Sequence, residues 1–561
     1  MDRHRPALTR RWALLAAALP VTFLSLFFLW PLANILALGL APEGQLQLGH
    51  VLETWARPWV LDTVVFTLAL AGLSTLLTLL LGLPAAWVFA RFTFPGKRVA
   101  RALTVVPFVL PTVVVGSAFL ALLGPRSPLN ELLGALFGEA FPQVRLDGSV
   151  AAILIAHVFY NIAVVIRLVG GMWAHIDPRT EEAARMLGAS GWTAFREVTW
   201  PLLRTAVASA ASIVFLFTVT SFGVVLLLGG PRDATLEVEI YRQTAVLLDL
   251  PTAAALTILQ MIGVLGLLLA SARAQEGLAV QQRLRGSGET ARRPRRGRER
   301  LLVGAILVAT VLFMFVPLAV LLERSLQWGN GYGLGAYASL IEADPRLRLS
   351  AAPWQSVIDS LAFAAATTLI AGSLGLLAAV VVGYRRGWFS RGLDALVMLP
   401  LGTSAVIVGF GFLVALDTPP LDLRTSILLI PIAHSLIALP FVMRSAVPVI
   451  RSIDDRLREA AAVLGASPRR TWREVDGPIL ARGALVGAGF AFAVSLGEFG
   501  ATLFIARPDT VTIPVAIYRL LGQPGAASFA TAMALAIVLM VLTASAVLLI
   551  ERLRGSGPQP F

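Results

Sequence analysis

The chain has 561 residues, of which 57% are hydrophobic and 14% are charged, and its formal net charge is +13. An ordinary soluble protein carries about 25% charged residues, so this composition excludes that class and favours a membrane protein. There is no cysteine, which excludes disulfides, thiolate catalysis and cysteine-ligated metals. The positive charge lies in short segments between apolar stretches, which predicts membrane orientation and argues against a nucleic-acid partner.

The first apolar stretch, from Trp12 to Leu40, follows a basic N-terminus and is interrupted by two prolines. A signal peptide has an apolar region of only about 7–15 residues. Because this stretch is far longer, we expect a retained first span and not a cleaved signal.

Further apolar stretches of the length that a spanning helix needs, about 20 residues, recur along the whole chain. The first half has six, near residues 13–39, 62–90, 103–124, 149–174, 204–229 and 252–272. The second half has six more, near residues 301–323, 356–383, 394–416, 427–448, 483–505 and 527–550. The sequence therefore predicts an all-α polytopic membrane protein with about 12 transmembrane helices.

Arginine-rich segments predict the orientation of these spans. The N-terminus and four loops are basic: residues 91–101, 175–203, 273–300 and 384–391. Placing the N-terminus in the cytoplasm puts all of them on the inner side, and the C-terminus follows. The segment 273–300 holds nine arginines. It is interpreted as a flexible cytoplasmic connector, with binding to anionic headgroups or RNA as the alternative.

The two halves repeat one another. Residues 155–169 align with 432–446, and residues 176–203 with 453–480, both at an offset of 277. Upstream, residues 81–87 align with 374–380 at an offset of 293. The difference of 16 is absorbed by a longer outer loop, residues 124–148, in the first half.

Two repeats of the same even-span topology run parallel, related by an axis along the membrane normal. We therefore expect a first six-span repeat at 1–272, a basic cytoplasmic linker at 273–300 and a second six-span repeat at 301–561. The chain is interpreted as a fused dimer of two six-span cores.

The most informative part of the repeat is a loop between two spans. It reads Glu-Ala-Ala, three residues, Gly, and then a short segment ending at proline. The positions are Glu182, Ala183, Ala184, Gly188 and Pro201 in the first copy, and Glu459, Ala460, Ala461, Gly465 and Pro478 in the second.

The spacing predicts a short helix that ends at a left-handed glycine. A second short helix is expected to follow, capped by Ser190 in one copy and Ser467 in the other. The small alanines permit close approach of another protein, and the glutamates offer it an acidic contact. The alternative, an amphipathic loop lying on the bilayer, does not require so many matching positions.

This pattern resembles the Glu-Ala-Ala coupling loop of bacterial ATP-binding-cassette (ABC) importer permeases, which have the type I importer fold. The resemblance implies that each loop's short coupling helix sits in a cleft of an ATPase subunit. It further implies two ATPase copies, an extracytoplasmic substrate-binding protein and a location in the bacterial inner membrane.

Within that family, the chain is most similar to the fused branch that serves thiamine and ferric-iron uptake. Residues 221–243 (SFGVVLLLGGPRDATLEVEIYRQ) and 156–161 (AHVFYN) are similar to thiamine permeases. Residues 496–504 (LGEFGATLF) resemble both thiamine and iron permeases. Thiamine and ferric iron are therefore the candidate substrates, with another small molecule behind them.

A P-loop needs the pattern G-x-x-x-x-G-K-[ST]. The one lysine, Lys97, is followed by Arg98, so no P-loop can occur. We therefore expect no cofactor and no catalytic residue in this chain, and ATP hydrolysis by separate subunits.

One acidic residue, Glu498, interrupts the eleventh predicted span, and its repeat counterpart is Ser221. A carboxylate at mid-membrane costs about 3 kcal/mol unless it is paired or faces a cavity. We hypothesise that both positions line a translocation pathway. A structural pair or a neutral, hydrogen-bonded acid is the alternative.

Three further pairs occupy matched positions. His157 and His434 are interpreted as interhelical hydrogen bonders, and a symmetric metal pair is the alternative. Arg167 and Arg444 are expected to reach headgroups or the coupling loop. Tyr241 and Tyr518 are expected in the aromatic belt or against a binding protein.

Two other classes of protein compete with the permease. An ion-gradient-driven secondary transporter can also have two parallel six-span halves. It does not need the duplicated Glu-Ala-Ala loops, and it usually places more charges in its spans. A membrane enzyme is less consistent with the sequence, which shows no cluster of nucleophile, base or metal ligands.

Overall fold

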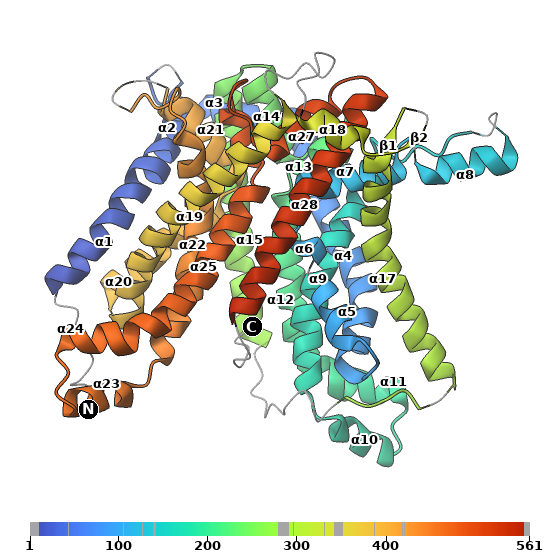
Figure 1. The fold of residues 1–561 in the computed structure, drawn as a ribbon, viewed down its shortest axis with the longest axis horizontal. Coiled ribbons are helices and arrows are strands. Elements are labelled where there is room, and N and C mark those ends of the chain that lie inside the picture. The colour runs from blue at the N-terminus through green and yellow to red at the C-terminus, as the bar shows by residue number, and fades with distance from the viewer. Residues whose placement is uncertain are drawn as a thin grey trace. The chain divides into compact units, whose positions relative to one another are not determined.

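The computed structural model describes residues 10–42, 44–104, 106–125, 127–138, 142–278, 291–295, 297–329, 331–341, 352–385, 387–417, 419 and 421–554. These residues form helices almost throughout, with one two-stranded antiparallel ladder between β1 (Gln327–Trp328) and β2 (Gly331–Tyr332). Part of the predicted linker, residues 279–290 and 296, lies outside the described residues (Figure 1). The predicted all-α class is confirmed.

The chain forms two compact units, each described here by itself. Unit 1 comprises residues 1–52, 240–258 and 327–561, and unit 2 comprises residues 53–239 and 259–326. The described residues of unit 1 include α1 (Arg10–Leu24), α2 (Trp30–Leu40), α18 (Gly335–Ile341), α19 (Pro353–Tyr384), α20 (Trp388–Gly402), α21 (Ala405–Ala415), α22 (Leu429–Ser452), α23 (Asp455–Val463), α24 (Pro468–Thr471), α25 (Gly477–Gly497), α26 (Gly500–Ile505), α27 (Ile513–Leu521) and α28 (Ala526–Arg554).

Unit 2 includes α4 (Pro58–Arg91), α5 (Lys97–Leu103), α6 (Val106–Val109), α7 (Thr112–Leu123), α8 (Pro128–Phe137), α9 (Val150–His175), α10 (Pro178–Met186), α11 (Gly191–Ala194), α12 (Trp200–Val219), α13 (Gly223–Leu228) and α17 (Gly297–Leu326). Three helices contribute residues to both units: α3 (Leu48–Ala56), α14 (Leu236–Tyr241) and α15 (Leu250–Leu278).

The first helix of each repeat packs with helices of the other repeat. In unit 1, α1 packs on α19 and α2 packs on α21. In unit 2, α17, which opens the second repeat, packs on α7 and α4. The compact units and the sequence repeats are therefore two different divisions of the chain.

Within the described residues, ten helices are long and apolar enough to cross a membrane, and two bent pairs raise the number to as many as twelve. The bent pairs are Lys97–Val109 with Thr112–Leu123, at 99°, and Trp388–Gly402 with Ala405–Ala415, at 96°. They replace the predicted spans 103–124 and 394–416. The two breaks lie at equivalent positions of the repeats, where Pro111 and Ser404 are the residues that precede the second helix of each pair.

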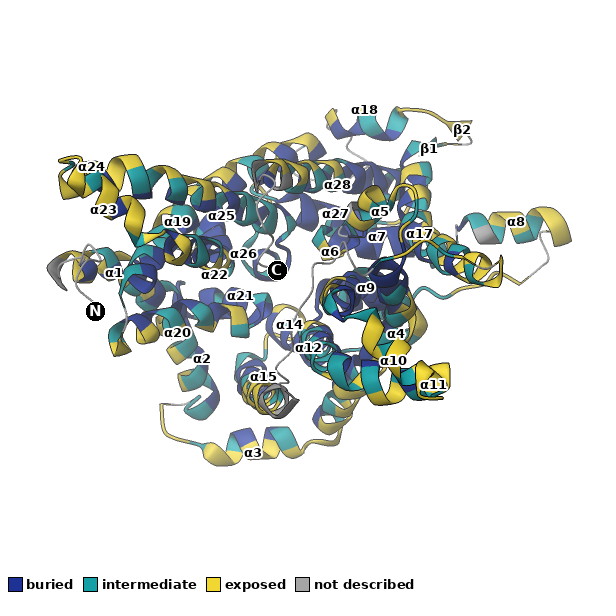
Figure 2. Ribbon diagram, turned by 90° about the horizontal axis from the view of Figure 1, so that it is seen from below, coloured by how far each residue is buried: buried dark blue, intermediate teal, exposed yellow. Residues whose placement is uncertain are grey.

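The middle helix of each unit is α9 in unit 2 and α22 in unit 1. Their most apolar windows are 72% buried, compared with 22–44% for the other eight long helices. Figure 2 shows α9 in the dark blue of buried residues, whereas its neighbours expose one side. Such uneven burial is expected where the outer helices keep an apolar face for lipid.

Glycine brings these middle helices close to their neighbours at equivalent places in both repeats. A Cβ atom on Gly82 of α4 would lie 2.8 Å from Val165 Cβ of α9. A Cβ atom on Gly375 of α19 would lie 2.7 Å from Val442 Cβ of α22. Small residues allow this close approach, which supplies the van der Waals contact that holds membrane helices together.

Gly82→Ala and Gly375→Ala should each lower the melting temperature of the purified protein, because the added methyl group must displace the facing valine. Overpacking of this kind costs about 1–3 kcal/mol. Gly72 and Gly372 lie on the same two helices with open space around them, so their alanine variants are matched controls with unchanged or slightly raised stability. Equal melting temperatures for crossing and control variants would contradict this packing.

Candidate functional site: the repeated loops and the buried histidine clusters

The first repeated loop is a sharp elbow between two short helices. Asp177 caps α10 by accepting a hydrogen bond, at 3.1 Å, from the backbone N–H two residues on. The helix ends at Gly188, whose φ is +92°. The N–H groups of Gly188 and Ala189 donate to the carbonyls of Arg185 and Ala184 at 3.0 and 3.1 Å. This pair of bonds is the Schellman motif, which closes a helix with a left-handed glycine.

The second loop has the same geometry. Asp454 caps α23 at 3.0 Å, and Gly465 ends it with φ at +81°. The N–H groups of Gly465 and Ala466 donate to the carbonyls of Ala462 and Ala461 at 3.0 and 2.9 Å. An identical set of backbone bonds at an offset of 277 residues confirms the predicted left-handed glycines.

The short helix after each glycine begins at the predicted serine. Ser190 accepts from the Thr193 N–H at 3.1 Å and opens α11. Ser467 accepts from the Arg470 N–H at 3.4 Å and opens α24. A five-residue π-helical segment then leads into α12 or α25 in each copy. The elbow is therefore continuous with a long apolar helix.

Both elbows present apolar side chains to solvent. Met186 and Leu187 are 88% and 91% exposed, and their equivalents Val463 and Leu464 are 87% and 86% exposed. The Glu-Ala-Ala glutamates, Glu182 and Glu459, are exposed as well, as are Ala183 and Ala460, whereas Ala184 and Ala461 are half-buried. Each loop thus offers an acidic and an apolar contact on one short surface.

Different residues anchor the two loops at equivalent positions. In the first loop, Thr199 donates to Glu181 at 3.3 Å. In the second loop, Arg458 binds Asp476 at 2.8–2.9 Å, and both side chains are nearly inaccessible. Burial lowers the pKa of Arg458, but the hydrogen bonds and charge of Asp476 raise it, and the net pKa lies above its ordinary value. The second anchor is a buried ion pair.

The C-terminal end of the basic linker is attached to unit 2. Arg292 accepts from the Thr93 N–H at 2.9 Å and donates its own N–H to the Arg91 carbonyl at 3.0 Å. Its guanidinium lies over the Phe92 ring and binds the Glu299 carboxylate. The hydrogen bonds to Glu299 raise the pKa of Arg292. The residues at 291–295 are therefore fixed beside the first repeat.

In unit 2, a buried histidine joins three helical segments. His157 of α9 is inaccessible; its Nδ1 pairs with the Ser74 hydroxyl of α4 and its Nε2 with the Ser221 hydroxyl, both at 2.9 Å. Ser221 follows the end of α12, and Tyr160 also hydrogen-bonds to it. The imidazole therefore holds the chain where it leaves α12.

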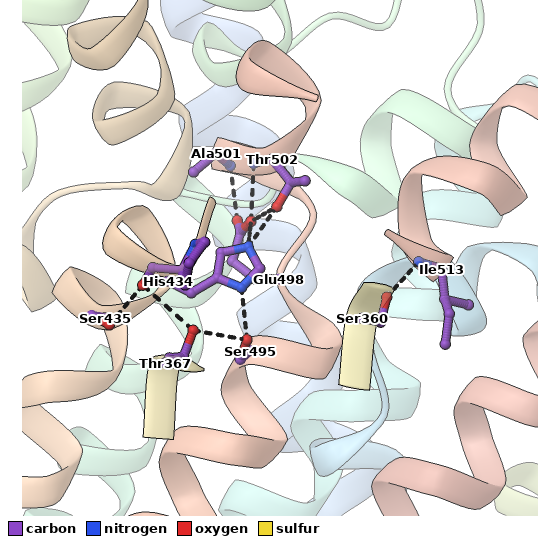
Figure 3. Close-up of polar contacts among 10 residues, drawn as sticks. Ser360, Thr367, His434, Ser435, Ser495, Glu498, Ala501, Thr502 and Ile513 are labelled. Atoms are coloured by element: carbon purple, nitrogen blue, oxygen red, sulfur yellow. Dashed lines mark hydrogen bonds and ion pairs between the residues drawn. The ribbon is translucent and has the colours of Figure 1, made fainter. Parts of the chain in front are cut away.

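His434 of α22 does the same in unit 1, with more partners (Figure 3). Its Nδ1 pairs with the Ser495 hydroxyl at 2.7 Å, and Ser495 in turn donates to Thr367 of α19 at 3.2 Å. Its Nε2 pairs with the Thr502 hydroxyl at 2.8 Å. The Thr502 hydroxyl also donates a hydrogen bond to the Glu498 carboxylate.

Glu498 does not lie inside a spanning helix. The helix of the eleventh predicted span ends at Gly497, and Glu498 precedes α26. Its carboxylate accepts the Ala501 and Thr502 N–H groups at 2.8 and 3.0 Å, and it lies 3.3 Å from His434 Nε2. Buried and fully hydrogen-bonded, it caps the first turn of α26. The fifth span likewise stops before Ser221, and the pathway role of both positions stays a prediction.

Other predicted residues have contacts of their own. The histidine nitrogens pair with hydroxyls, and no group of three or more metal-type ligands occurs among the described residues. Arg167 is exposed, and Arg444 lies 3.9 Å from Asp394 of α20, not at the coupling loop. Tyr241 and Tyr518 hydrogen-bond to each other within unit 1. Tyr241 and Tyr518, at equivalent positions of the two repeats, are thus in direct contact.

Two buried glutamates are not among the residues predicted from the sequence. Glu237 and Glu239 of α14 are 0% and 7% exposed, and Gln260 of α15 donates a hydrogen bond to Glu237. The two glutamates alternate with apolar residues in the stretch LEVEIY, and this alternation is the one sequence signal that points to them. Their repeat counterparts, Pro514 and Ala516, are uncharged.

Asp476→Asn should loosen the second loop, because it leaves the Arg458 cation buried without its main partner. Removing one member of a buried ion pair costs about 3 kcal/mol. Asp455→Asn removes the exposed partner of the same arginine and is the matched control, with an expected cost of about 0–1 kcal/mol. Tryptic cleavage within residues 454–473 should accelerate for Asp476→Asn alone. Similar cleavage rates for both variants would refute the buried anchor.

Comparison with known proteins identifies a family that matches this chain. The family described as "Binding-protein-dependent transport system inner membrane component" matches residues 78–276 and 371–555, one match in each repeat. The chain is 28% identical to the thiamine transport system permease protein ThiP of Brucella abortus, over 88% of each chain. It is 27% identical to ThiP of Escherichia coli, over 89% of this chain and 90% of that one.

Among solved structures, a bacterial ABC transporter involved in alginate import has a TM-score of 0.42 and 18% sequence identity, over 49% of this chain and 98% of the other. The family matches cover more than half of the chain. The chain therefore belongs to the binding-protein-dependent transport system inner membrane components, as the two-core permease subunit of an ABC importer and not its catalytic subunit.

Proposed function

We propose that the two elbows dock two copies of an ABC ATPase and pass its movement to the permease. The observation that carries this proposal is the identical elbow at α10–α11 and α23–α24, each with two exposed apolar side chains beside an exposed glutamate. Contacts that combine a small apolar anchor with a charged rim are typical of specific protein docking. A duplicated docking element fits a partner present in two copies.

The bonds inside each loop explain how a push on the elbow reaches the membrane. In unit 1, the Arg458–Asp476 ion pair joins α23 to the segment that opens α25. In unit 2, the Glu181–Thr199 hydrogen bond joins α10 to the segment that opens α12. A load on either elbow is therefore transmitted to a long helix. Each of those helices ends at the residue cluster around a buried histidine.

We further propose that the cargo is thiamine. Support comes from the relatives named as thiamine permeases, which match along nearly the whole chain. Ferric iron has no such support among them. The family description names a binding-protein-dependent system, so an extracytoplasmic protein would deliver the cargo. The basic segments would then face the cytoplasm, with both termini on that side of the inner membrane.

Leu187→Glu and Leu464→Glu should each weaken ATPase docking, because each places a charge where the elbow would meet an apolar pocket. Loss of a central apolar anchor costs at least about 1.4 kcal/mol, or tenfold in affinity. Leu334→Glu is the matched control, since Leu334 is 70% exposed and lies between β2 and α18, outside both repeated loops in sequence. Co-purification of the ATPase with each variant measures the effect. Undiminished recovery with both loop variants would overturn the docking proposal.

Glu498→Gln should raise the KM for thiamine uptake if the carboxylate attracts a cationic cargo. The same change also weakens the cap of α26, so a second variant is needed. Thr502→Val removes a hydrogen bond to the carboxylate but keeps its charge. Uptake into vesicles and the melting temperature are measured for both. A pathway role predicts a higher KM for Glu498→Gln alone, whereas equal KM values for both variants would leave Glu498 as a cap and nothing more.

A further inference from the structure

Helix α8 (Pro128–Phe137) belongs to the longer outer loop that the second repeat lacks. Ser127 caps it by accepting the Asn130 N–H at 3.2 Å, and Pro128 occupies its first turn. Both residues favour a helix that starts at this point. The insertion thus encodes a defined ten-residue helix.

Two sets of polar bonds fix α8 to unit 2. The Asn130 side chain donates to the Val144 carbonyl at 2.9 Å and accepts the Val144 N–H at 2.8 Å. Arg324, near the end of α17, binds the Glu131 carboxylate at 2.7 Å. The Arg324 side chain is only 2% exposed, so this ion pair holds its position. The first turn of α8 therefore lies directly beside Arg324.

Arg324 marks the end of the apolar belt of α17. No charged residue occurs between Arg300 and Glu323, and the side chains of Val308, Leu312 and Leu322 are exposed along this stretch. In a membrane-spanning helix, such exposed apolar side chains face lipid, and the first charges beyond them lie at the membrane–water boundary. The ion pair to Glu131 therefore places α8 at that boundary.

From there α8 runs sideways, across the direction of α17 and beyond it. Figures 1 and 2 show this in two perpendicular views of unit 2. Leu132 and Leu136, one helical turn apart, are 56% and 65% exposed. The helix has no lysine or arginine, and Arg324 engages its one acidic residue. An apolar helix with this orientation needs an apolar surface beside it.

We propose that α8 is an in-plane helix that inserts its Leu132 and Leu136 side chains into the leaflet that is the outer one in the orientation proposed above. The exposed apolar side chains of α17 end at Arg324, which binds the first turn of α8, so lipid is the occupant that the structure favours. The helix then holds the outer end of α17 at a fixed depth. Since α17 packs on α4 and α7, α8 anchors unit 2 at the outer surface of the membrane that the chain spans.

The absence of cysteine in the chain allows a direct test with single labels. Leu132→Cys and Leu136→Cys would carry an environment-sensitive fluorophore in the full chain, reconstituted in phosphatidylcholine–phosphatidylglycerol vesicles. Arg145→Cys, on the exposed loop next to α8, is the aqueous control. Lipids with a nitroxide near the headgroup should quench the two leucine positions several times more strongly than the control. Iodide in the outer solution should show the reverse order.

Equal quenching of all three positions by the lipid nitroxide would overturn the proposal. So would iodide access at Leu132 and Leu136 that only an added extracytoplasmic binding protein removes, because α8 would then be a protein-docking helix. Arg324→Gln in the Leu136→Cys background guards against a purely local effect. Releasing the anchor should reduce lipid quenching at the label while the apolar belt of α17 stays intact.

Discussion

The structure depends on how backbone N–H groups find hydrogen-bond partners where the chain leaves a long helix inside the protein. After α12 and after α25 the helix stops, and the following N–H groups are buried, where an unpaired polar group costs several kcal/mol. After α25, the Glu498 carboxylate beside His434 accepts two of them, from Ala501 and Thr502, at 2.8 and 3.0 Å. Hydroxyls at equivalent positions complete the arrangement, because Thr67 and Ser360 accept the N–H groups that begin α14 and α27 at 3.0 and 2.8 Å.

This shared scaffold carries different chemistry in its two copies. Ser221 in one repeat corresponds to Glu498 in the other, and Thr199 corresponds to Asp476. The elbow geometry nevertheless stays the same, because backbone bonds and a left-handed glycine determine it and the anchoring side chains do not. Duplicated docking elements are therefore compatible with an asymmetric pathway.

Features that depend on local sequence could be predicted. Hydropathy located the long helices, and the glycine and serine positions located the elbows, since caps are set by neighbours a few residues away. The exchange of first helices could not be predicted, because no local pattern encodes which repeat a helix packs against. The predicted spans near Ser221 and Glu498 extend past the ends of α12 and α25, because an apolar stretch continues beyond the end of each helix. The contact of Glu498 with His434 could not be predicted either, because the two residues lie 64 positions apart in sequence.

We expect this chain to move its cargo only when a separate ATPase acts on the two elbows. Uptake of labelled thiamine into vesicles that contain this chain, with and without the ATPase and with the binding protein outside, tests it most directly. Uptake should require both the ATPase and enclosed ATP. Uptake that persists without any ATPase, driven by an imposed proton or sodium gradient, would contradict it and favour a secondary transporter.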